Sequence, residues 1–212
     1  MRILILGAAG QISRYLTPML LEQTDAELVQ FARNANQRIL KKDSSREIVI
    51  DGDFDDVDAL IKAMQGVDIV YMNKATGNMT TVKNIVSAMK AAGASKLILA
   101  SVLGIYGEVH GAFGEWNRGM VGTATDRRDV AEYIEASGID YTILRLTWLY
   151  NQDGNFDYEI TQKGEPFKGA QVTRQAVAQL IVDIVKDAEH TYSNTNLGVG
   201  GPNTDFAKPS FY

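Results

Sequence analysis

The first residues whose types and spacing indicate chemistry are the small ones in GAAGQIS, residues 7–13. Small side chains let the main chain approach a phosphate closely, and the N–H groups and dipole of a helix N-terminus attract its negative charge. We expect a tight turn at Gly7, the close approach at Gly10, and helix-on-strand packing at Ser13. The stretch therefore predicts a site for a dinucleotide pyrophosphate, formed by Gly7, Ala8, Ala9, Gly10, Gln11, Ile12 and Ser13.

The pattern G-x-x-G-x-x-S is short, and an ordinary strand-to-helix turn can carry it as well. Its position favours nucleotide binding, because the apolar run Arg2 to Leu6 has the length of a buried strand and stops at Gly7. Ile12, Leu16 and Leu20 then recur at helical spacing. Strand, glycine turn and helix thus follow one another in the order that such a site requires.

One arginine bears on the choice of cofactor. The run Glu27 to Ala32 reads as a second strand, and Arg33 follows it with no carboxylate in the next five residues. At this tip an Asp or Glu binds the ribose 2′-hydroxyl of NAD, whereas an arginine pairs with the 2′-phosphate of NADP. NADP is the expected cofactor. NAD remains the alternative, because loop arginines are often simply solvated.

Polar residues also follow the third and fourth predicted strands. Glu47 to Ile50 leads into the acidic run 51–56, which lacks the glutamate that closes a calcium-binding EF-hand loop. We expect a helix capped by Asp55 or Asp56 there. Asp53 is expected to lie beside the adenine, and Phe54 is a further candidate in the cofactor site. The strand Ile69 to Met72 ends at Asn73 and Lys74. Lys74 is either a ligand of a phosphate or ribose oxygen, or a plain solvent lysine.

Ser101 directly follows the fifth predicted strand, Lys96 to Ala100, and a glycine-rich stretch comes next. Residues 103–122 carry a glycine every few positions with Tyr106 and other aromatic residues between them. Long loops in compact domains are usually lids or disordered segments, and the apolar content argues against disorder. We expect a mobile loop that covers an apolar substrate pocket. The alternative is a loop packed on its own hydrophobic cluster.

The alternation of strands and helices predicts an α/β fold, a Rossmann-type doubly wound parallel sheet. We expect residues 1–212 to form a single domain, with a small C-terminal extension on the substrate side. Within that extension, residues 150–172 are expected to hold a small hairpin. A helix from Thr173 to Lys186 and a closing strand at Leu197 to Val199 complete the prediction.

Composition restricts the partners. The net charge of −5 and the pI near 5.1 disfavour a nucleic-acid partner. The chain has no cysteine and two histidines, so we expect no metal site. It opens on a core strand without a leader and has no apolar run of membrane-spanning length, so we expect no membrane partner and a cytoplasmic location. A small-molecule substrate is the expected partner, bound by a monomer or a homodimer.

Several motifs together resemble a known family. They are ILGAAGQIS at the N-terminus, the Arg33 tip, Asp51-Gly52-Asp53, Ser101, SGIDYTILR (137–145) and VTRQAVAQLIV (172–182). The chain resembles the atypical short-chain dehydrogenases, the NAD(P)H-binding, NmrA-like group. The resemblance implies a Rossmann fold that binds NADP(H) across the strand ends. By it, Gly7 to Ser13 bind the pyrophosphate, Arg33 the 2′-phosphate and Asp53 the adenine. The segments at Asn73 and Ser101 face the nicotinamide.

The chain departs from this family where catalysis is expected. Members commonly use Tyr-x-x-x-Lys, in which the lysine lowers the pKa of the tyrosine that exchanges a proton with the substrate. Here Arg128 stands at the lysine position and Ala124 at the tyrosine position. A permanently charged guanidinium does not tune a tyrosine in the same way. Thr147 also replaces a proline found in many relatives. The remaining candidates for catalysis are Ser101, Tyr106 and Arg128.

Two functions are compatible with these residues. The first is an NADPH-dependent reductase that passes hydride to a small flat acceptor such as a flavin, a quinone or a conjugated carbonyl. The cofactor carries that chemistry, and a flavin-like acceptor takes its proton from water, so the missing tyrosine is tolerated. The second is a non-catalytic NmrA-like protein that senses NAD(P). A sugar-nucleotide epimerase is disfavoured, because there is no room for a substrate domain.

Overall fold

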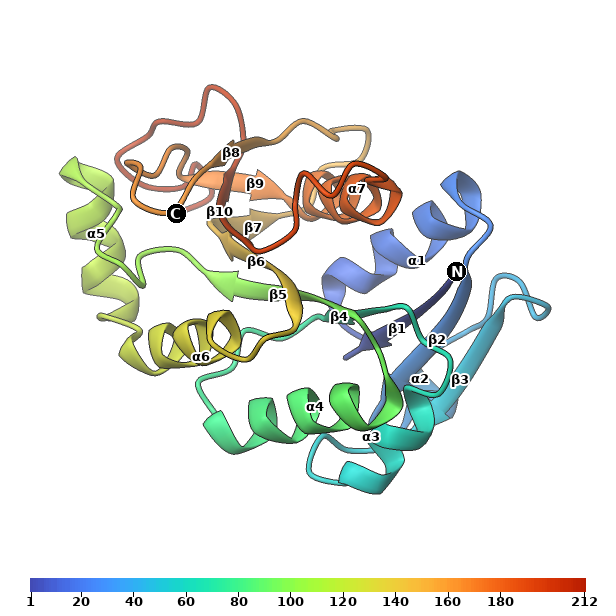
Figure 1. Ribbon diagram of the computed structural model, residues 1–212. Coiled ribbons are helices and arrows are strands. Elements are labelled where there is room, and N and C mark those ends of the chain that lie inside the picture. The colour runs from blue at the N-terminus through green and yellow to red at the C-terminus, as the bar shows by residue number, and fades with distance from the viewer.

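The apolar runs of the sequence become neighbouring strands of one sheet in the computed structural model, which describes all 212 residues (Figure 1). The strand order is β3-β2-β1-β4-β5-β6-β10-β8, and β8 alone runs antiparallel to its neighbour. Because the order reverses between β1 and β4, the sheet is doubly wound, and the predicted Rossmann-type α/β fold is confirmed. The strands are β1 (Arg2–Leu6), β2 (Glu27–Ala32), β3 (Glu47–Asp51), β4 (Ile69–Met72), β5 (Lys96–Val102), β6 (Asp140–Leu146), β8 (Glu159–Thr161) and β10 (Thr195–Gly200).

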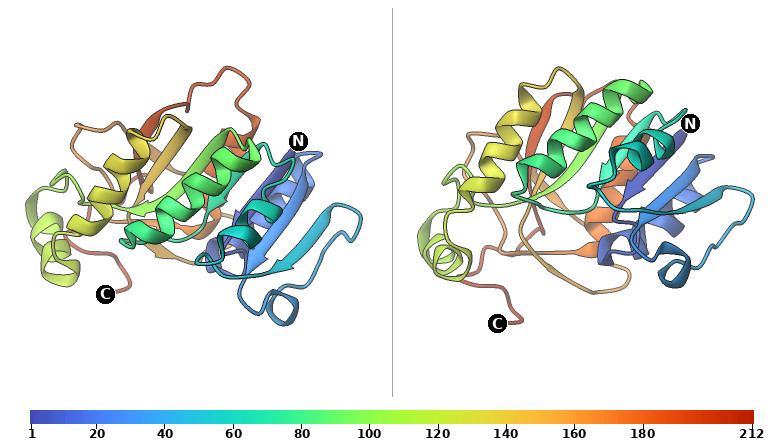
Figure 2. Two further views of the ribbon diagram at one scale, coloured as in Figure 1. Left: turned by 60° about the horizontal axis from the view of Figure 1, so that its bottom comes forward. Right: turned by 90° about the horizontal axis from the view of Figure 1, so that it is seen from below.

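Helices cover both faces of the sheet, as Figures 1 and 2 show. One face carries α1 (Gln11–Gln23) and α7 (Arg174–Lys186), and the other carries α3 (Val57–Ala63), α4 (Met79–Ala92) and α6 (Thr125–Glu135). The two faces bury apolar clusters of 26 and 24 residues, so neither face of the sheet is left to solvent. The apolar residues that α7 turns toward the sheet are all buried: Val177, Leu180, Ile181, Ile184 and Val185.

Short polar side chains cap the N-termini of several of these helices. The Asp56 carboxylate accepts from the Ala59 N–H at 2.9 Å at the start of α3. The Thr173 hydroxyl accepts from the Ala176 N–H at 2.9 Å at the start of α7, and Asn78 caps α4 in the same way. Each cap satisfies N–H groups that have no partner inside the helix. The caps fix where the helices begin, and so where the preceding strand-end loops lie.

The predicted loop at residues 103–122 is wrong in its second half. Residues Gly111–Val121 form a helix, α5, at one end of the molecule (Figure 1). Phe113, Trp116 and Asn117 are spaced three and four residues apart, which puts them on one side of a helix. Asn117 is buried, and the rings of Phe113 and Trp116 stack with centroids 6.1 Å apart. These contacts outweigh the low helix propensity of the glycines.

The predicted hairpin within residues 150–172 is also wrong. Its arms pair with other strands: β8 joins β10 at the end of the main sheet, and β9 (Gln171–Thr173) pairs in parallel with β7 (Trp148–Tyr150). The register places Trp148 opposite Gln171. β8 finds its backbone partner at the open edge of β10, and β9 finds its partner in the segment after β6. These partners lie far away in the sequence, so local pairing does not predict them.

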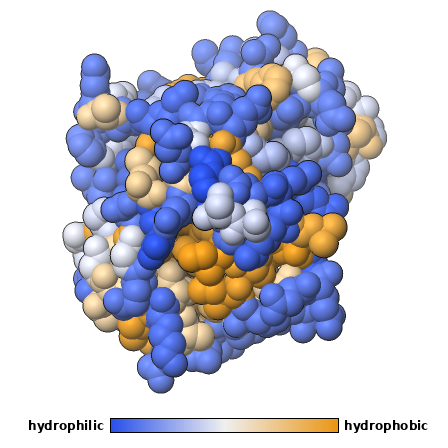
Figure 3. All heavy atoms as spheres, turned by 90° about the vertical axis from the view of Figure 1, so that its right-hand side faces the viewer, coloured by the Kyte–Doolittle hydropathy of each residue, from blue (hydrophilic) through white to orange (hydrophobic).

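The opposite end of the sheet is the edge strand β3, on the side of the molecule shown in Figure 3. Hydrophobic atoms gather at the centre of this face, with hydrophilic residues around them (Figure 3). Leu40 and Ile48 are the exposed large hydrophobic residues of this edge and of the segment before it. No helix in the structure combines the length and apolar character needed to cross a membrane. A cytoplasmic location stays a prediction.

Candidate functional site

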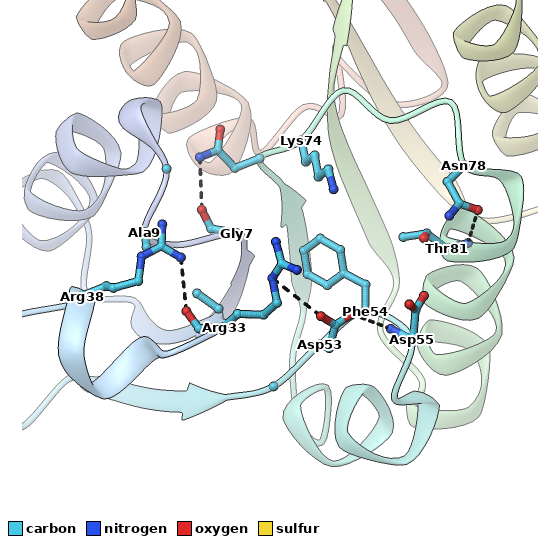
Figure 4. A pocket seen from close by; sticks show the side chains of 14 residues that line it. Gly7, Ala9, Arg33, Arg38, Asp53, Phe54, Asp55, Lys74, Asn78 and Thr81 are labelled. Carbon is cyan, nitrogen blue, oxygen red and sulfur yellow. Dashed lines mark hydrogen bonds and ion pairs between the residues drawn. The ribbon is translucent and has the colours of Figure 1, made fainter.

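A polar hollow of about 320 Å³ lies at the ends of β1 to β4, beside the point where the strand order reverses (Figure 4). Open α/β sheets bind ligands at this place. The hollow contains eight of the residues predicted to bind the cofactor, whereas Ala8, Gln11, Ile12, Ser13 and Ser101 do not line it. Its lining residues are Gly7, Ala9, Gly10, Ala32, Arg33, Arg38, Gly52, Asp53, Phe54, Asp55, Asn73, Lys74, Asn78 and Thr81.

The glycine turn is held in place by Asn73. Gly7 adopts a φ of 80°, and a Cβ atom at Gly10 would collide with the Asn73 amide. That amide nitrogen donates to the Ser13 hydroxyl at 2.8 Å and to the Gly7 carbonyl at 3.3 Å. Its oxygen accepts from the Tyr71 hydroxyl at 2.9 Å. Burial raises the pKa of Tyr71, so this phenol stays a donor. Ser13 and Asn73 therefore shape the turn from beneath.

The N-terminus of α1 can accept an anion. Its N-cap residue is Gly10, which has no side chain to bond the first-turn N–H groups, and the first turn carries no acidic residue. These N–H groups and the helix dipole therefore lack the side-chain partner that the caps of α3, α4 and α7 supply. A pyrophosphate fits this end of the hollow, because its charge is opposite to that of the N-terminal end of the helix dipole and the side chains that line the wall are small.

Two arginines stand at the tip after β2. The Arg33 Nε atom lies 3.6 Å from an Asp53 oxygen, and both side chains are largely open to solvent. Arg38 donates to the Arg33 carbonyl at 3.2 Å and lines the same hollow (Figure 4). The sequence interpretation missed Arg38, which belongs to the short helix α2 (Ala35–Arg38). Asp51 shapes this tip by accepting the N–H groups of residues 34 and 35.

Aromatic and basic side chains complete the polar hollow. The ring of Phe54 stacks on that of Phe31 with an interplanar angle of 16° and centroids 6.1 Å apart. Phe54 thus gives the hollow a flat wall beside Asp53, where the adenine is expected. Lys74 is exposed and extends over the hollow from the end of β4 (Figure 4). It forms no ion pair, which leaves its ammonium available to a phosphate or a ribose oxygen.

A second, apolar hollow of about 460 Å³ lies beyond the ends of β5 and β6. Nine of its thirteen lining residues are hydrophobic, in contrast to three of fourteen in the polar hollow. The ring of Trp148 lies 4.9 Å from that of Trp116 and 5.1 Å from that of Tyr212, and its Nε1 donates to Asn117 at 2.9 Å. The lining residues are Val102, Leu103, Asn117, Val121, Ala124, Arg127, Leu146, Thr147, Trp148, Leu149, Arg174, Phe211 and Tyr212.

The three catalytic candidates lie outside both hollows. Ser101 is buried on β5, next to residues that line the apolar hollow. Tyr106 and Arg128 come together at a third, polar hollow of about 330 Å³. The Arg128 Nε atom lies 2.8 Å from the Glu132 carboxylate, and the Tyr106 hydroxyl lies 3.4 Å from that of Glu135. The structure thus brings Tyr106 and Arg128 to one hollow and keeps Ser101 apart from them.

A buried ion pair fixes the loop between β5 and α5. The guanidinium of Arg145, fully buried, donates to Glu108 at 2.5 Å and to the Asn196 side chain at 2.9 Å. Glu108 also accepts the N–H groups of Gly104 and Tyr106 at 3.0 and 2.9 Å. Sequence reasoning missed this role, although Arg145 ends the SGIDYTILR motif.

No three His, Cys, Asp or Glu side chains come together as a metal site.

Burial is the first cause that raises the pKa of Tyr106, and the nearby charge of Glu135 adds to it. Lys163 acts in the opposite sense: its Nζ atom lies 4.4 Å from the centre of the Tyr106 ring, and it bonds Glu135 at 2.6 Å. The net shift is upward, so the phenol is neutral near neutral pH. A neutral phenol held between Glu135 and Asn196 supports the surrounding loop by hydrogen bonding.

Comparisons with known proteins agree with this geometry. The family model described as NAD(P)H-binding matches residues 7–188. A short-chain dehydrogenase/reductase from Veillonella parvula, solved in complex with NADP, is 36% identical, with 99% of each chain covered and a TM-score of 0.93. A Rossmann-fold NAD(P)-binding family protein from Shigella flexneri is 38% identical, covering 100% of this chain and 98% of its own, with a TM-score of 0.81. Quinone oxidoreductase 2 from Escherichia coli is 28% identical over 69% of this chain and 48% of its own length.

Proposed function

We propose that this chain, which belongs to the NAD(P)H-binding family of Rossmann-fold oxidoreductases, is an NADPH-dependent reductase for a small flat acceptor. The acceptor classes that fit are flavins, quinones and conjugated carbonyls. The observation that carries the proposal is the placement of a polar and an apolar hollow at the carboxyl ends of the parallel strands. The first suits a dinucleotide, and the aromatic walls of the second suit a flat molecule.

The two arginines at the tip after β2 support NADPH over NADH. A pair as exposed as that of Arg33 and Asp53 is weak in water, so it leaves the guanidinium free to bind a phosphate. Arg38 adds a second cation without an ion pair of its own. Two guanidiniums suit the doubly charged 2′-phosphate of NADPH better than the neutral 2′-hydroxyl of NADH. The NADP complex of the relative from Veillonella parvula also supports this choice.

The bound cofactor would supply the hydride. The residues of this chain would bind and orient it: the glycine turn and the first turn of α1 would hold the pyrophosphate, and Asp53 and Phe54 would flank the adenine. Trp148 and Leu146, which line the apolar hollow, would keep water from one side of the acceptor. A quinone or flavin can draw its proton from solvent, so a reduction of this kind does not require Tyr-x-x-x-Lys.

Proton transfer by Ser101, Tyr106 or Arg128 stays part of the proposal. Ser101 is favoured among the three, because it directly precedes Val102 and Leu103 of the apolar hollow. The other two would first have to leave Glu135 and Glu132. Ser101→Ala should then lower kcat for acceptors that need a proton from the protein and leave quinone reduction unchanged. Equal activity with every acceptor would remove Ser101 from the mechanism.

The test is oxidation of NADPH and of NADH by the purified protein, followed at the nicotinamide absorbance. Flavins, quinones and conjugated enals serve as acceptors, and cofactor affinity is measured in parallel. We expect turnover with at least one acceptor and a higher kcat/KM with NADPH. Ala124 in place of the family tyrosine favours a second candidate, a non-catalytic NAD(P) sensor. Tight cofactor binding with no turnover would support the sensor.

A further inference from the structure

One of the two arginines that line the apolar hollow, Arg174, has no carboxylate partner. Arg174, the first residue of α7, lines the hollow and is half-buried. Its guanidinium donates to the neutral side chain of Asn151 at 3.0 Å and forms no ion pair. Burial lowers the pKa of Arg174, which reflects the cost of holding this charge away from water. A bound anion would offset that cost.

Arg174 is unusual among the arginines of this chain. Six others form ion pairs, among them Arg127, which also lines the apolar hollow and binds the adjacent Asp126 at 3.0 Å. Three more have no ion pair, but Arg14, Arg38 and Arg118 are exposed and are solvated by water. Arg174 alone combines partial burial with the lack of a carboxylate partner. Its charge is therefore available to a ligand.

The walls around Arg174 set the shape of that ligand. Trp148, Phe211 and Tyr212 line the same hollow, and Tyr212 contacts Trp148 edge-on with ring centroids 5.1 Å apart. Aromatic walls favour a flat ring system, and a guanidinium binds a carboxylate through two parallel hydrogen bonds. The hollow thus offers apolar, aromatic surface together with one planar cationic group.

We propose that the acceptor is a flat conjugated or aromatic molecule that bears a carboxylate, and that Arg174 is the residue that binds this carboxylate. The proposal rests on the reductase function and adds the charge of the substrate to it. Arg127 contributes less, because two hydrogen bonds of 3.0 and 3.1 Å already hold its guanidinium on the Asp126 carboxylate. The same guanidinium chemistry would also suit a phosphate of the cofactor, and the test separates the two sources.

The test compares naphthalene-2-carboxylate with its neutral isostere naphthalene-2-carboxamide. Each is titrated by calorimetry into the protein saturated with NADP⁺. We expect the carboxylate to bind about tenfold more tightly or better, the ratio expected for a hydrogen-bonded charge pair. Arg174→Gln should remove this preference and leave the affinity for NADPH within about twofold. Arg118→Gln, which removes an exposed arginine outside the hollow, should retain the preference.

Equal binding of the two ligands by the unaltered protein would overturn the proposal without any variant. So would a preference that survives Arg174→Gln, or a loss of NADPH affinity in that variant, which would assign Arg174 to a cofactor phosphate. If Arg174→Gln does not fold, Arg174→Lys keeps the charge without the planar fork and should keep only part of the preference. A carboxylate preference without any NADPH oxidation would instead leave the anion site standing and reject the reductase function.

Discussion

The two hollows along the sheet edge are built in opposite ways. The polar hollow is made by the segments that follow β1, β2, β3 and β4, together with single residues of α2 and α4. The apolar hollow draws on β5, α5, α6, β6, β7, α7 and residues 211 and 212. One presents arginines and backbone N–H groups to solvent, and the other presents aromatic rings and one unpaired cation. The difference fits the proposed division into a cofactor end and a substrate end.

The buried pair beneath the apolar end gives the largest expected effect. Glu108→Gln leaves the Arg145 charge buried without its carboxylate, and should lower the free energy of unfolding by about 3 kcal/mol in urea denaturation. The matched control is Glu132→Gln, which breaks the exposed pair with Arg128 and should leave the free energy of unfolding nearly unchanged. Similar losses in the two variants would mean that Glu108 does not support the apolar end.

The next effect separates the cofactors at the polar end. Arg33→Ala should weaken NADPH binding about 30-fold, or about 2 kcal/mol, because a charge-assisted bond to the 2′-phosphate is lost. NADH binding should change by less than about twofold, since NADH has no such phosphate. Fluorescence titration of both cofactors measures this, with Arg118→Ala as the control. Equal losses for NADPH and NADH would reject the 2′-phosphate site.

A smaller effect should appear only at the apolar end. Trp148→Leu removes an aromatic wall and should lower kcat/KM for a flat acceptor about tenfold, with cofactor affinity unchanged. Trp116→Leu is the control, because Trp116 contacts Trp148 without lining the hollow. Steady-state kinetics and a cofactor titration give the two readouts. A parallel loss of cofactor affinity in Trp148→Leu would show that the ends are not independent.

The smallest effect concerns pH. Burial tends to raise the pKa of Glu135, but hydrogen bonds from Lys163, Asn196 and Tyr106 and the charge of Lys163 outweigh it, and the net shift is downward. A carboxyl with a lowered pKa stabilises the fold above its unfolded pKa, near 4.3, and loses this contribution as the pH falls through the folded value. Glu135→Gln should therefore cost about 0.5 kcal/mol at pH 7 and close to nothing near pH 3.

Urea denaturation at both pH values measures this difference, with Glu132→Gln as the control for an exposed pair. A cost of Glu135→Gln that grows as the pH falls would have the wrong sign. It would exclude an ionised Glu135 as the link between α6 and Lys163.

The sequence predicted the polar end far better than the apolar one, for a physical reason. Gly7, Arg33, Asp53 and Asn73 each follow their own strand directly, and parallel strands bring such positions to one edge. Arg38 was missed, because it enters the hollow only through a left-handed residue, Asn34, that starts the helix α2.

At the apolar end, long-range contacts decide the structure. Trp116 meets Tyr212 with ring centroids 5.2 Å apart, although the two lie at opposite ends of the C-terminal half of the chain. No local pattern predicts such a contact. The helix α5 and the strand pair β7 and β9 were misread for the same reason, since their partners lie far away in the sequence. Arg174 was part of a recognised motif, but its position in the apolar hollow followed only from the fold.

The most direct test of the account is a single-turnover reaction with NADPH deuterated at C4 of the nicotinamide. Protein preloaded with the labelled cofactor is mixed with the best acceptor, and oxidation is followed by absorbance. Hydride transfer from the cofactor in the polar hollow to the acceptor in the apolar hollow predicts that bound NADPH is oxidised. It also predicts that deuterium on one face of C4 slows the reaction. Bound NADPH that no acceptor oxidises would contradict the reductase function.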